Sequence, residues 1–167
     1  MKLIKEIKDQ DLGFEKKKGF LSLREAARAV LFNEERKIAL LYVNSHNFYK
    51  LPGGGVESGE YVEDALEREV LEEAGCNIEI IKEIGQINEE RTHFGKFQKS
   101  YCYLGKVKGS IGKPSFTLGE IADGFELQWH SIDKAIELAE GTETDDYMGK
   151  FVKERLLTVL KEAKKLI

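Results

Sequence analysis

A glycine triplet runs directly into a charged, helix-forming segment at residues 53–76, which read GGGVESGEYVEDALEREVLEEAGC. The pattern predicts a helix over residues 60–74, with Ser58 as its N-cap and Gly75 as the residue that stops it. Side chains four residues apart share one helix face, so an apolar stripe can anchor this helix to a sheet. The stripe consists of Val62, Leu66, Val70 and Ala74.

Three glutamates of this helix, Glu69, Glu72 and Glu73, have the spacing i, i+3 and i+4 and therefore share a face next to the stripe. Like charges so close together destabilise an isolated helix by roughly a few tenths of a kcal/mol per pair. A divalent cation would reverse that sign, and Mg²⁺ prefers hard oxygen ligands of this kind. The spacing therefore indicates a metal site, whereas the ordinary alternative is a solvated acidic face.

The glycines before the helix suit a ligand that approaches the backbone closely. Glycine has no Cβ and adopts positive φ, so Gly53, Gly54 and Gly55 can form a tight turn against a bound group. A carbonyl of Gly53 or Gly54 could complete a metal shell. Free amides near a helix N-terminus bind phosphate oxygens, and we expect Gly54 and Gly55 to contact substrate.

The length and composition are those of one globular domain over residues 1–167. The formal net charge is −4, so a phosphate-bearing substrate would need local cations or bound metal. No apolar run approaches a membrane span and charges occur throughout the first residues, which predicts neither a membrane anchor nor a signal peptide. Cys76 and Cys102 are the only cysteines; this predicts reduced thiols in a cytoplasmic protein, with a single bridge as the alternative.

Strand and helix patterns follow one another along the chain without strict alternation. We expect two strands within residues 28–44 around the turn NEER, and a loop over residues 112–124. Further strands are predicted at 48–55, 77–87, 97–109 and 125–132, with helices from Asp133, near the N-cap, to 140 and over 143–165. This order favours an α/β fold with a mixed sheet between helices on both faces.

Read from Gly54 to Cys76, the segment resembles the signature box of the Nudix hydrolases, G-x5-E-x7-R-E-U-x-E-E-x-G-U, where U is a bulky aliphatic residue. Eight of the nine fixed positions match, and Cys76 is the departure, which we expect to alter packing but not metal binding. The flanks YKLPGGGVESGE and GFELQWHSIDKAIE are also similar to the family, over roughly residues 24–140. The resemblance implies a Nudix-type α/β/α sandwich that cleaves a diphosphate linked to another moiety.

The resemblance also implies roles for the matching positions. Glu69, Glu72 and Glu73 correspond to the glutamates that ligate Mg²⁺ or Mn²⁺, with help from the Gly53 or Gly54 carbonyl. Arg68 matches the arginine that orients the catalytic carboxylates, often through an ion pair with the position of Glu60.

The general base is a box glutamate in some family members and a residue of a distant loop in others. Outside the box, Glu120 in TLGEIADG is the best candidate, and Glu89 and Glu90 are the next two. The alternative for Glu120 is an ordinary charge on a loop.

Two arginines and several aromatic residues are candidates for substrate contacts. Arg24 and Arg28 can reach substrate phosphate, but a structural ion pair is the favoured interpretation. Trp129 lies in an alternating strand, which favours core packing over base stacking. Tyr49, Phe94 and Phe97 suit either role equally.

The substrate is inferred by elimination. The downstream proline typical of the ADP-ribose type, the tyrosine of the diadenosine-polyphosphate type and the several prolines of the NADH type are missing, which leaves a nucleoside triphosphate pyrophosphohydrolase of the MutT kind. An ADP-ribose or sugar-nucleotide pyrophosphatase and a non-catalytic nucleotide sensor are the alternatives, although the complete set of box glutamates favours catalysis. A 5′-end RNA pyrophosphohydrolase is a further alternative, but nucleic acid is disfavoured as a partner because the lysines are scattered and the net charge is negative. A homodimer is the default oligomer.

Overall fold

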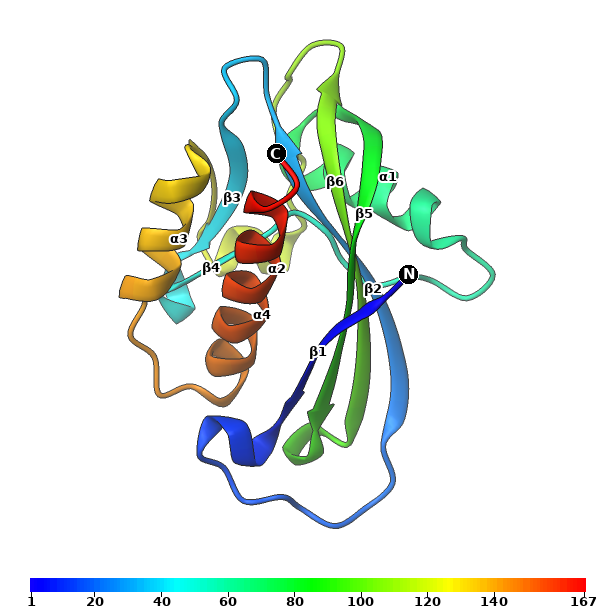
Figure 1. Cartoon of the computed structure of the whole chain (residues 1–167), viewed down its shortest axis with the longest axis vertical. Helices are drawn as coiled ribbons and strands as arrows, with labels where there is room; N and C mark the ends of the chain where they lie inside the picture. Colours follow the sequence, from blue (N-terminus) through cyan, green and yellow to red (C-terminus); the bar gives the residue numbers. More distant parts are fainter.

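The computed structural model describes residues 1–167 and contains seven strands in one mixed sheet (Figure 1). The strand order is β1-β5-β6-β2-β3-β4, and β7 pairs with β3. β1 with β5 and β2 with β6 are parallel pairs, and the other neighbouring strands are antiparallel. The strands are β1 (Leu3–Lys8), β2 (Ser22–Phe32), β3 (Ile38–Val43), β4 (Phe48–Lys50), β5 (Asn77–Arg91), β6 (Lys96–Lys108) and β7 (Phe125–His130).

The sheet is divided between β2 and β3. β2 follows β6 from Ser22 to Phe32, whereas it meets β3 in a single registered pair, Phe32 with Ile38. From that pair the strand β2 and the group β3, β4 and β7 diverge (Figure 1). The division opens space between the two parts of the sheet, where side chains of both can face a ligand.

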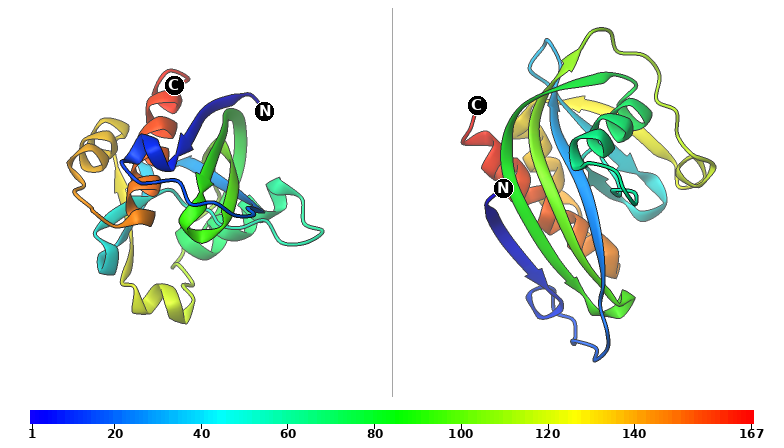
Figure 2. Two further views of the ribbon diagram at one scale, coloured as in Figure 1. Left: turned by 90° about the horizontal axis from the view of Figure 1, so that it is seen from below. Right: turned by 90° about the vertical axis from the view of Figure 1, so that its right-hand side faces the viewer.

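Helices cover both faces of the sheet. The helix α1 (Val62–Ala74) packs on one face, and α3 (Ile132–Gly141) and α4 (Tyr147–Lys164) lie on the other (Figure 2). A short helix, α2 (Leu118–Ala122), precedes β7, and three 3-10 turns are η1 (Asp9–Leu12), η2 (Asn44–His46) and η3 (Thr92–Phe94). The expected α/β/α sandwich with a mixed sheet is confirmed. None of the helices combines the length and apolar character needed to span a bilayer.

Two separate hydrophobic cores hold the three layers together. The core under α4 contains Phe151, Leu156 and Leu160, packed on β1, β5 and β6 residues such as Ile7 and Ile87. The second core lies under α1. It contains the predicted stripe residues Leu66, Val70 and Ala74, which are fully buried, with Val62 at its edge and Trp129 packed against it. Core packing of Trp129 is therefore confirmed.

Several boundaries differ from the sequence-based expectation. The N-cap of α1 is Tyr61 and not Ser58, whereas Gly75 ends the helix as expected in the left-handed conformation. The N-cap of α3 is Ser131, which accepts a hydrogen bond from Lys134 N–H, so Asp133 lies inside the helix. Hydroxyl side chains compete well with carboxylates for this position. The helix α2 falls within the predicted loop 112–124, and β1 was not predicted.

The N-terminal segment is fixed to the far end of β5. The buried carboxylate of Asp9 accepts hydrogen bonds from the hydroxyls of Thr92 in η3 and Tyr147 in α4. Tyr147 in turn packs edge-on against Phe94 at a centroid distance of 5.0 Å. Residues before β2 thereby set the position of η3.

Candidate active site

The carboxylates of α1 occupy two different environments. Arg68 Nη1 lies 2.9 Å from Glu69 Oε1 and 3.9 Å from Glu72 Oε2, and the Glu72 side chain keeps 45% of its surface exposed. Glu73 is only 1% exposed. Its carboxylate accepts hydrogen bonds from Lys50 Nζ at 2.6 Å and from the Gly53 N–H at 2.7 Å. Burial raises the pKa of Glu73, and Lys50 opposes that rise.

The expected convergence of Glu69, Glu72 and Glu73 on one point is not present. No group of three or more His, Cys, Asp or Glu side chains lies close enough together to hold a metal ion. The helical spacing places their Cα atoms on one face, but Lys50 and the Gly53 amide turn the Glu73 carboxylate into the protein. The hydrogen bonds of Glu73 therefore decide where its carboxylate lies, although the helix places its Cα beside those of Glu69 and Glu72.

The glycine turn is shaped around this helix. Gly53 has φ of 134°, and a Cβ there would lie 2.1 Å from the Ala27 carbonyl oxygen. A Cβ on Gly54 would lie 2.2 Å from the carboxylate carbon of Glu69. Glycine is required at both positions, at Gly53 for its backbone conformation and at Gly54 because the backbone and carboxylate are in contact.

The oxygen atoms of this turn and of the adjacent carboxylates suit a hard divalent cation as ligands. The Gly54 carbonyl accepts a hydrogen bond from Ala27 N–H at 3.0 Å, whereas no hydrogen bond reaches the Gly53 carbonyl. Carboxylate and carbonyl oxygens, with no thiol or imidazole among them, are ligands that Mg²⁺ and Mn²⁺ accept. The residues present therefore fit such an ion in chemistry, with Gly53 favoured over Gly54 as the carbonyl.

Arg68 connects the turn to the helix. Its guanidinium donates to Glu60 through Nε at 3.0 Å and Nη2 at 3.1 Å, and to the Gly55 carbonyl at 3.1 Å. The expected ion pair of Arg68 with Glu60 is thus present. Hydrogen bonding to Arg68 holds the pKa of Glu60 below its usual value, and the same contact raises the pKa of Arg68. The Glu69 carboxylate, which Arg68 also binds, is fixed in orientation as a result.

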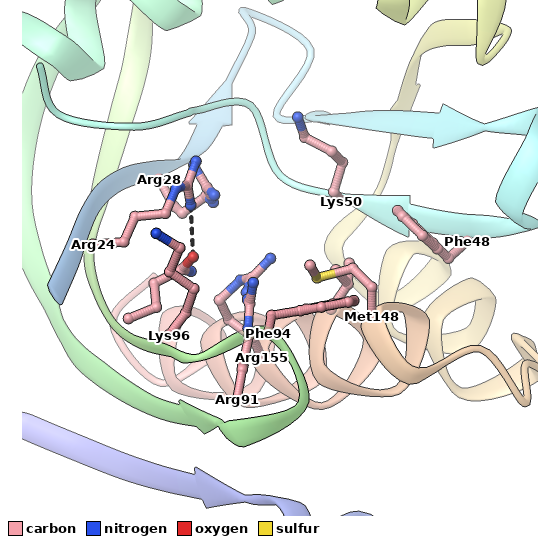
Figure 3. A pocket seen from close by; sticks show the side chains of 11 residues that line it. Arg24, Arg28, Phe48, Lys50, Arg91, Phe94, Lys96, Met148 and Arg155 are labelled. Atoms are coloured by element: carbon pink, nitrogen blue, oxygen red, sulfur yellow. Dashed lines mark hydrogen bonds between the residues drawn. The ribbon is translucent and has the colours of Figure 1, made fainter. Parts of the chain in front are cut away.

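A pocket of about 410 Å³ opens beside these groups, where the two parts of the sheet diverge (Figure 3). Six of its lining side chains are basic and none is a carboxylate. They come from β2, β4, β5, β6 and α4, and the basic pocket is the name used below for this cavity. Its lining residues are Arg24, Arg28, Phe48, Lys50, Arg91, Phe94, Lys96, Gln98, Met148, Val152 and Arg155.

Arg24 and Arg28 do not form the structural ion pairs that the sequence favoured. Neither has a carboxylate within 4.0 Å; Arg24 Nη1 donates to Gln98 Oε1 at 2.6 Å, and Arg28 Nη1 donates to the Ala27 carbonyl at 2.9 Å. Both line the basic pocket: beyond the Phe32–Ile38 pair the edge of β2 bonds to the glycine turn and not to β3, which leaves the space in front of these two side chains open. The less favoured interpretation, a role in binding phosphate, fits this placement.

A buried ion network forms the floor of the basic pocket. Glu89 is fully buried. Its carboxylate accepts hydrogen bonds from Arg91 Nη2 at 2.6 Å, Arg155 Nη1 at 2.7 Å and Gln98 Nε2 at 2.8 Å. These three donors occupy the carboxylate and leave it no free position for a water, which argues against Glu89 as a general base. Glu90 is paired with Lys16 at 2.9 Å on the outside.

Lys50 joins the basic pocket to the acidic helix. It lines the pocket and binds Glu73. The glycine turn also touches the pocket strand β2 directly, since a Cβ on Gly53 would lie 2.9 Å from the Cα of Arg28. The glycine turn, the carboxylates and the pocket therefore form one continuous site. A ligand with an anionic chain could contact all three.

Four basic residues of the pocket were not predicted from the sequence: Lys50, Arg91, Lys96 and Arg155. Arg155 had a usable signal, since it is four residues after Phe151 and four before Val159, both fully buried on α4. A charged residue within an apolar stripe indicates a buried ion pair. Arg91 and Lys96 border η3, and nothing in their local pattern distinguishes them from surface charges.

Glu120 is not brought to the carboxylates of α1 by any hydrogen bond or ion pair. Its carboxylate accepts Thr117 N–H at 2.8 Å, and Thr117 Oγ1 accepts Glu120 N–H at 3.3 Å. This is a capping box that closes the N-terminus of α2. The expectation that Glu120 is the general base has no contact to support it.

We expect Glu120→Gln to keep kcat within about twofold, because glutamine also serves in a capping box and only the charge is removed. Steady-state hydrolysis with saturating substrate measures this directly. A loss of about a hundredfold or more would return Glu120 to the role of general base.

Similarity to known proteins defines the class. A family model described as NUDIX domain matches residues 22–151. A putative 8-oxo-dGTP diphosphatase of Bacillus subtilis is 32% identical over 111 residues, which cover 64% of this chain and 66% of that protein. An RNA pyrophosphohydrolase of Sulfurovum sp. is 55% identical over 122 residues, covering 66% of this chain and 78% of that protein.

Solved structures agree on the fold. The Ap4A hydrolase of C. elegans superposes with a TM-score of 0.61 at 17% identity, covering 87% of this chain and 98% of that chain. The MutT protein of Methanosarcina mazei has a TM-score of 0.57 at 24% identity, covering 81% and 94%. The named relatives are hydrolases of phosphoric anhydrides. The chain belongs to the NUDIX family.

Proposed function

We propose that this protein is a divalent-metal-dependent pyrophosphohydrolase of the MutT kind, which converts a nucleoside triphosphate to a nucleoside monophosphate and pyrophosphate. The observation that carries the proposal is the continuity of the acidic helix α1 with the basic pocket through Lys50. Oxygen donors for a cation lie at one end and six cationic side chains at the other. This arrangement suits a chain of phosphates better than a neutral substrate.

The proposed ligands of Mg²⁺, or of Mn²⁺ in its place, are Glu69, Glu72, Glu73 and the Gly53 carbonyl. Glu73 would have to leave Lys50, and substrate phosphate offers Lys50 another anionic partner. When bound, the metal would neutralise the charge that develops on the phosphate oxygens and lower the pKa of a bound water. Arg68 keeps Glu69 oriented, which limits the reorganisation that binding requires.

Glu72 is the residue proposed to accept the proton of the attacking water. Its side chain is the most exposed of the three and accepts no hydrogen bond, so its oxygen atoms are available. Glu73 is less suited, because Lys50 and the Gly53 amide occupy both of its oxygens. Arg24, Arg28 and Lys50 are proposed to bind substrate phosphates from the side of the basic pocket.

The names of similar proteins support a triphosphate substrate. The Bacillus relative is called a putative 8-oxo-dGTP diphosphatase, and a protein of Danio rerio, 32% identical over 82 residues, an oxidized purine nucleoside triphosphate hydrolase. The matched segment spans 66% of the first and 48% of the second. Both names describe the same reacting group, a nucleoside 5′-triphosphate.

A 5′-triphosphate on RNA is the second candidate substrate. Scattered lysines in the sequence argued against nucleic acid, but six basic side chains gather in the basic pocket. The similar Sulfurovum protein bears the name RNA pyrophosphohydrolase. The two candidates share the triphosphate and differ in whether an RNA chain is attached to the first nucleoside.

The test is hydrolysis of a substrate panel by the purified protein in MgCl₂. We expect pyrophosphate release from nucleoside triphosphates, complete loss of activity in excess EDTA, and recovery when MgCl₂ is restored. A 5′-triphosphorylated oligonucleotide, ADP-ribose and a sugar nucleotide complete the panel. Turnover confined to ADP-ribose or the sugar nucleotide would contradict the proposal, and a strong preference for the oligonucleotide would select the second candidate.

A further inference from the structure

The side chains of the basic pocket offer hydrogen-bond donors almost without acceptors. Arginine and lysine side chains only donate. Gln98 is the one lining side chain with an amide oxygen, and Arg24 Nη1 already donates to it at 2.6 Å. Its amide nitrogen donates to Glu89 and to Ser100 Oγ at 2.9 Å, which fixes the orientation of the amide. A polar group entering the basic pocket therefore meets an excess of hydrogen-bond donors.

The positive charge of the basic pocket is only partly compensated. Glu89 neutralises part of the charge of Arg91 and Arg155, and Glu73 pairs with Lys50. Arg24, Arg28 and Lys96 have no carboxylate within 4.0 Å. The Nε atoms of Arg28 and Arg91 have no hydrogen-bond partner, although these residues are only 6% and 5% exposed. Buried donors without partners are uncommon, so the guanidinium groups of Arg28 and Arg91 are incompletely satisfied.

The arginines also repel one another. Burial lowers the pKa of Arg28 to about 9, and repulsion by Arg155 and Arg24 adds to this. Burial likewise lowers the pKa of Arg91 to about 10, with Glu89 opposing the shift and Arg155 adding to it. A bound anion would pair with these groups and remove much of that unfavourable interaction.

The cationic side chains favour phosphate over the polar edge of a nucleobase, although Phe48, Phe94, Met148 and Val152 also line the pocket. Adenine, guanine and cytosine carry amino groups that donate, and here those donors would face cations with no free side-chain acceptor. Phosphate oxygens only accept, and arginine binds them in bidentate geometry. The scissile pair of phosphates belongs beside α1, where the metal would neutralise it, so the cations without a carboxylate partner, Arg24, Arg28 and Lys96, remain for further charge.

We propose that the basic pocket binds phosphate groups beyond the scissile pair, so that the enzyme selects its substrate by the length of the phosphate chain and not by the base. This inference rests on the proposed function. For a nucleoside triphosphate cleaved between the α- and β-phosphates, the γ-phosphate occupies the pocket, and a tetraphosphate fills more of it. A diphosphate ester leaves the cations without a partner.

Binding of inorganic tripolyphosphate tests the inference without catalysis. The probe is titrated calorimetrically into the metal-free protein in EDTA, with adenosine as the base-bearing comparison. Lys96→Gln removes a cation from the basic pocket, and Lys106→Gln is its matched control, on the same strand but paired with Glu79 outside the pocket. We expect the first substitution to weaken tripolyphosphate binding about tenfold and the second to leave it unchanged.

Arg24→Gln provides a second variant, with an exposed side chain; Arg155 is left intact because its replacement would strip a partner from buried Glu89. Arg24→Gln is expected to weaken binding to a similar extent as Lys96→Gln. Tripolyphosphate that fails to bind, or binds equally to the Lys96 and Lys106 variants, overturns the inference. So does adenosine that binds as tightly as tripolyphosphate.

Kinetics separate this inference from the proposed function. We expect similar kcat/KM for ATP, GTP, CTP and UTP, a higher value for adenosine tetraphosphate, and a value for ADP lower by about a hundredfold. Triphosphate hydrolysis with a preference of tenfold or more for one base, 8-oxo-dGTP included, sustains the proposed function and overturns the inference. Tripolyphosphate binding that depends on Lys96, in a protein that cleaves no triphosphate, sustains the inference about the basic pocket and overturns the proposed function.

Discussion

Replacement of Glu72 by glutamine is expected to lower kcat by about a hundredfold or more, as loss of a general base does, while the melting temperature stays unchanged. Glu72 is the half-exposed carboxylate of α1, and its nearest cation, Arg68 Nη1, is 3.9 Å away. The substitution therefore removes a reactive group and breaks no hydrogen bond. Pyrophosphate release at saturating substrate and MgCl₂, together with a thermal melt, measures both quantities.

Two further variants of the same helix sharpen that result. Glu67→Gln alters an exposed glutamate of α1 and is expected to change nothing. Glu73→Gln loses the ion pair with Lys50, so we expect it to lower both kcat and the free energy of unfolding, the latter by about 1–3 kcal/mol. Full activity in the Glu72 and Glu73 variants would refute the assignment of metal ligands and base.

Replacement of Gly54 by alanine is expected to reduce kcat by about a hundredfold, the penalty of displacing a catalytic group by about 1 Å. The added Cβ would lie 2.2 Å from the carboxylate carbon of Glu69 and 2.3 Å from Oε2, so the carboxylate must move. Glu69 is held by Arg68, which also binds Glu60 and Gly55, and the displacement will disturb that set of contacts. Activity at saturating substrate and a titration with MgCl₂ report the effect.

Gly141→Ala is the matched control. A Cβ at Gly141, at the end of α3, would have no atom within 4 Å, and the substitution stays far from α1 in sequence and contacts. It is expected to retain full activity. A Gly54 variant as active as the Gly141 variant would show that the contact between Gly54 and Glu69 has no catalytic consequence.

Much of the acidic half of the site could be predicted from local sequence. The helix, its apolar stripe and its glycine end depend on residues at most a few turns apart, and the structure reproduces them with a shift of the N-cap from Ser58 to Tyr61. The pairing of Arg68 with Glu60 lies within the same segment. The mixed sheet and the two helical layers also followed from the order of strand and helix patterns.

The remaining features depend on contacts between distant segments. Glu120 closes a short helix where a loop was expected, and β1 becomes a strand only because β5 provides a parallel partner. Arg24 and Arg28 were expected in ion pairs, but they line a cavity to which β4, β5, β6 and α4 also contribute side chains. Such outcomes depend on which strands become neighbours, and one sequence gives little information on that.

The sequence by itself determined the acidic helix and the glycine turn before it, because the spacing of α1 and the contact of Gly54 with Glu69 lie within one short segment, whereas the space at Gly53 is limited by Ala27 of β2. Only the tertiary structure decided that Glu73 turns inward to Lys50, and that cations from five strands and helices surround one pocket. Electrostatic interactions act through space, so the charge around a ligand is set by elements that the chain brings together from positions 24 to 155.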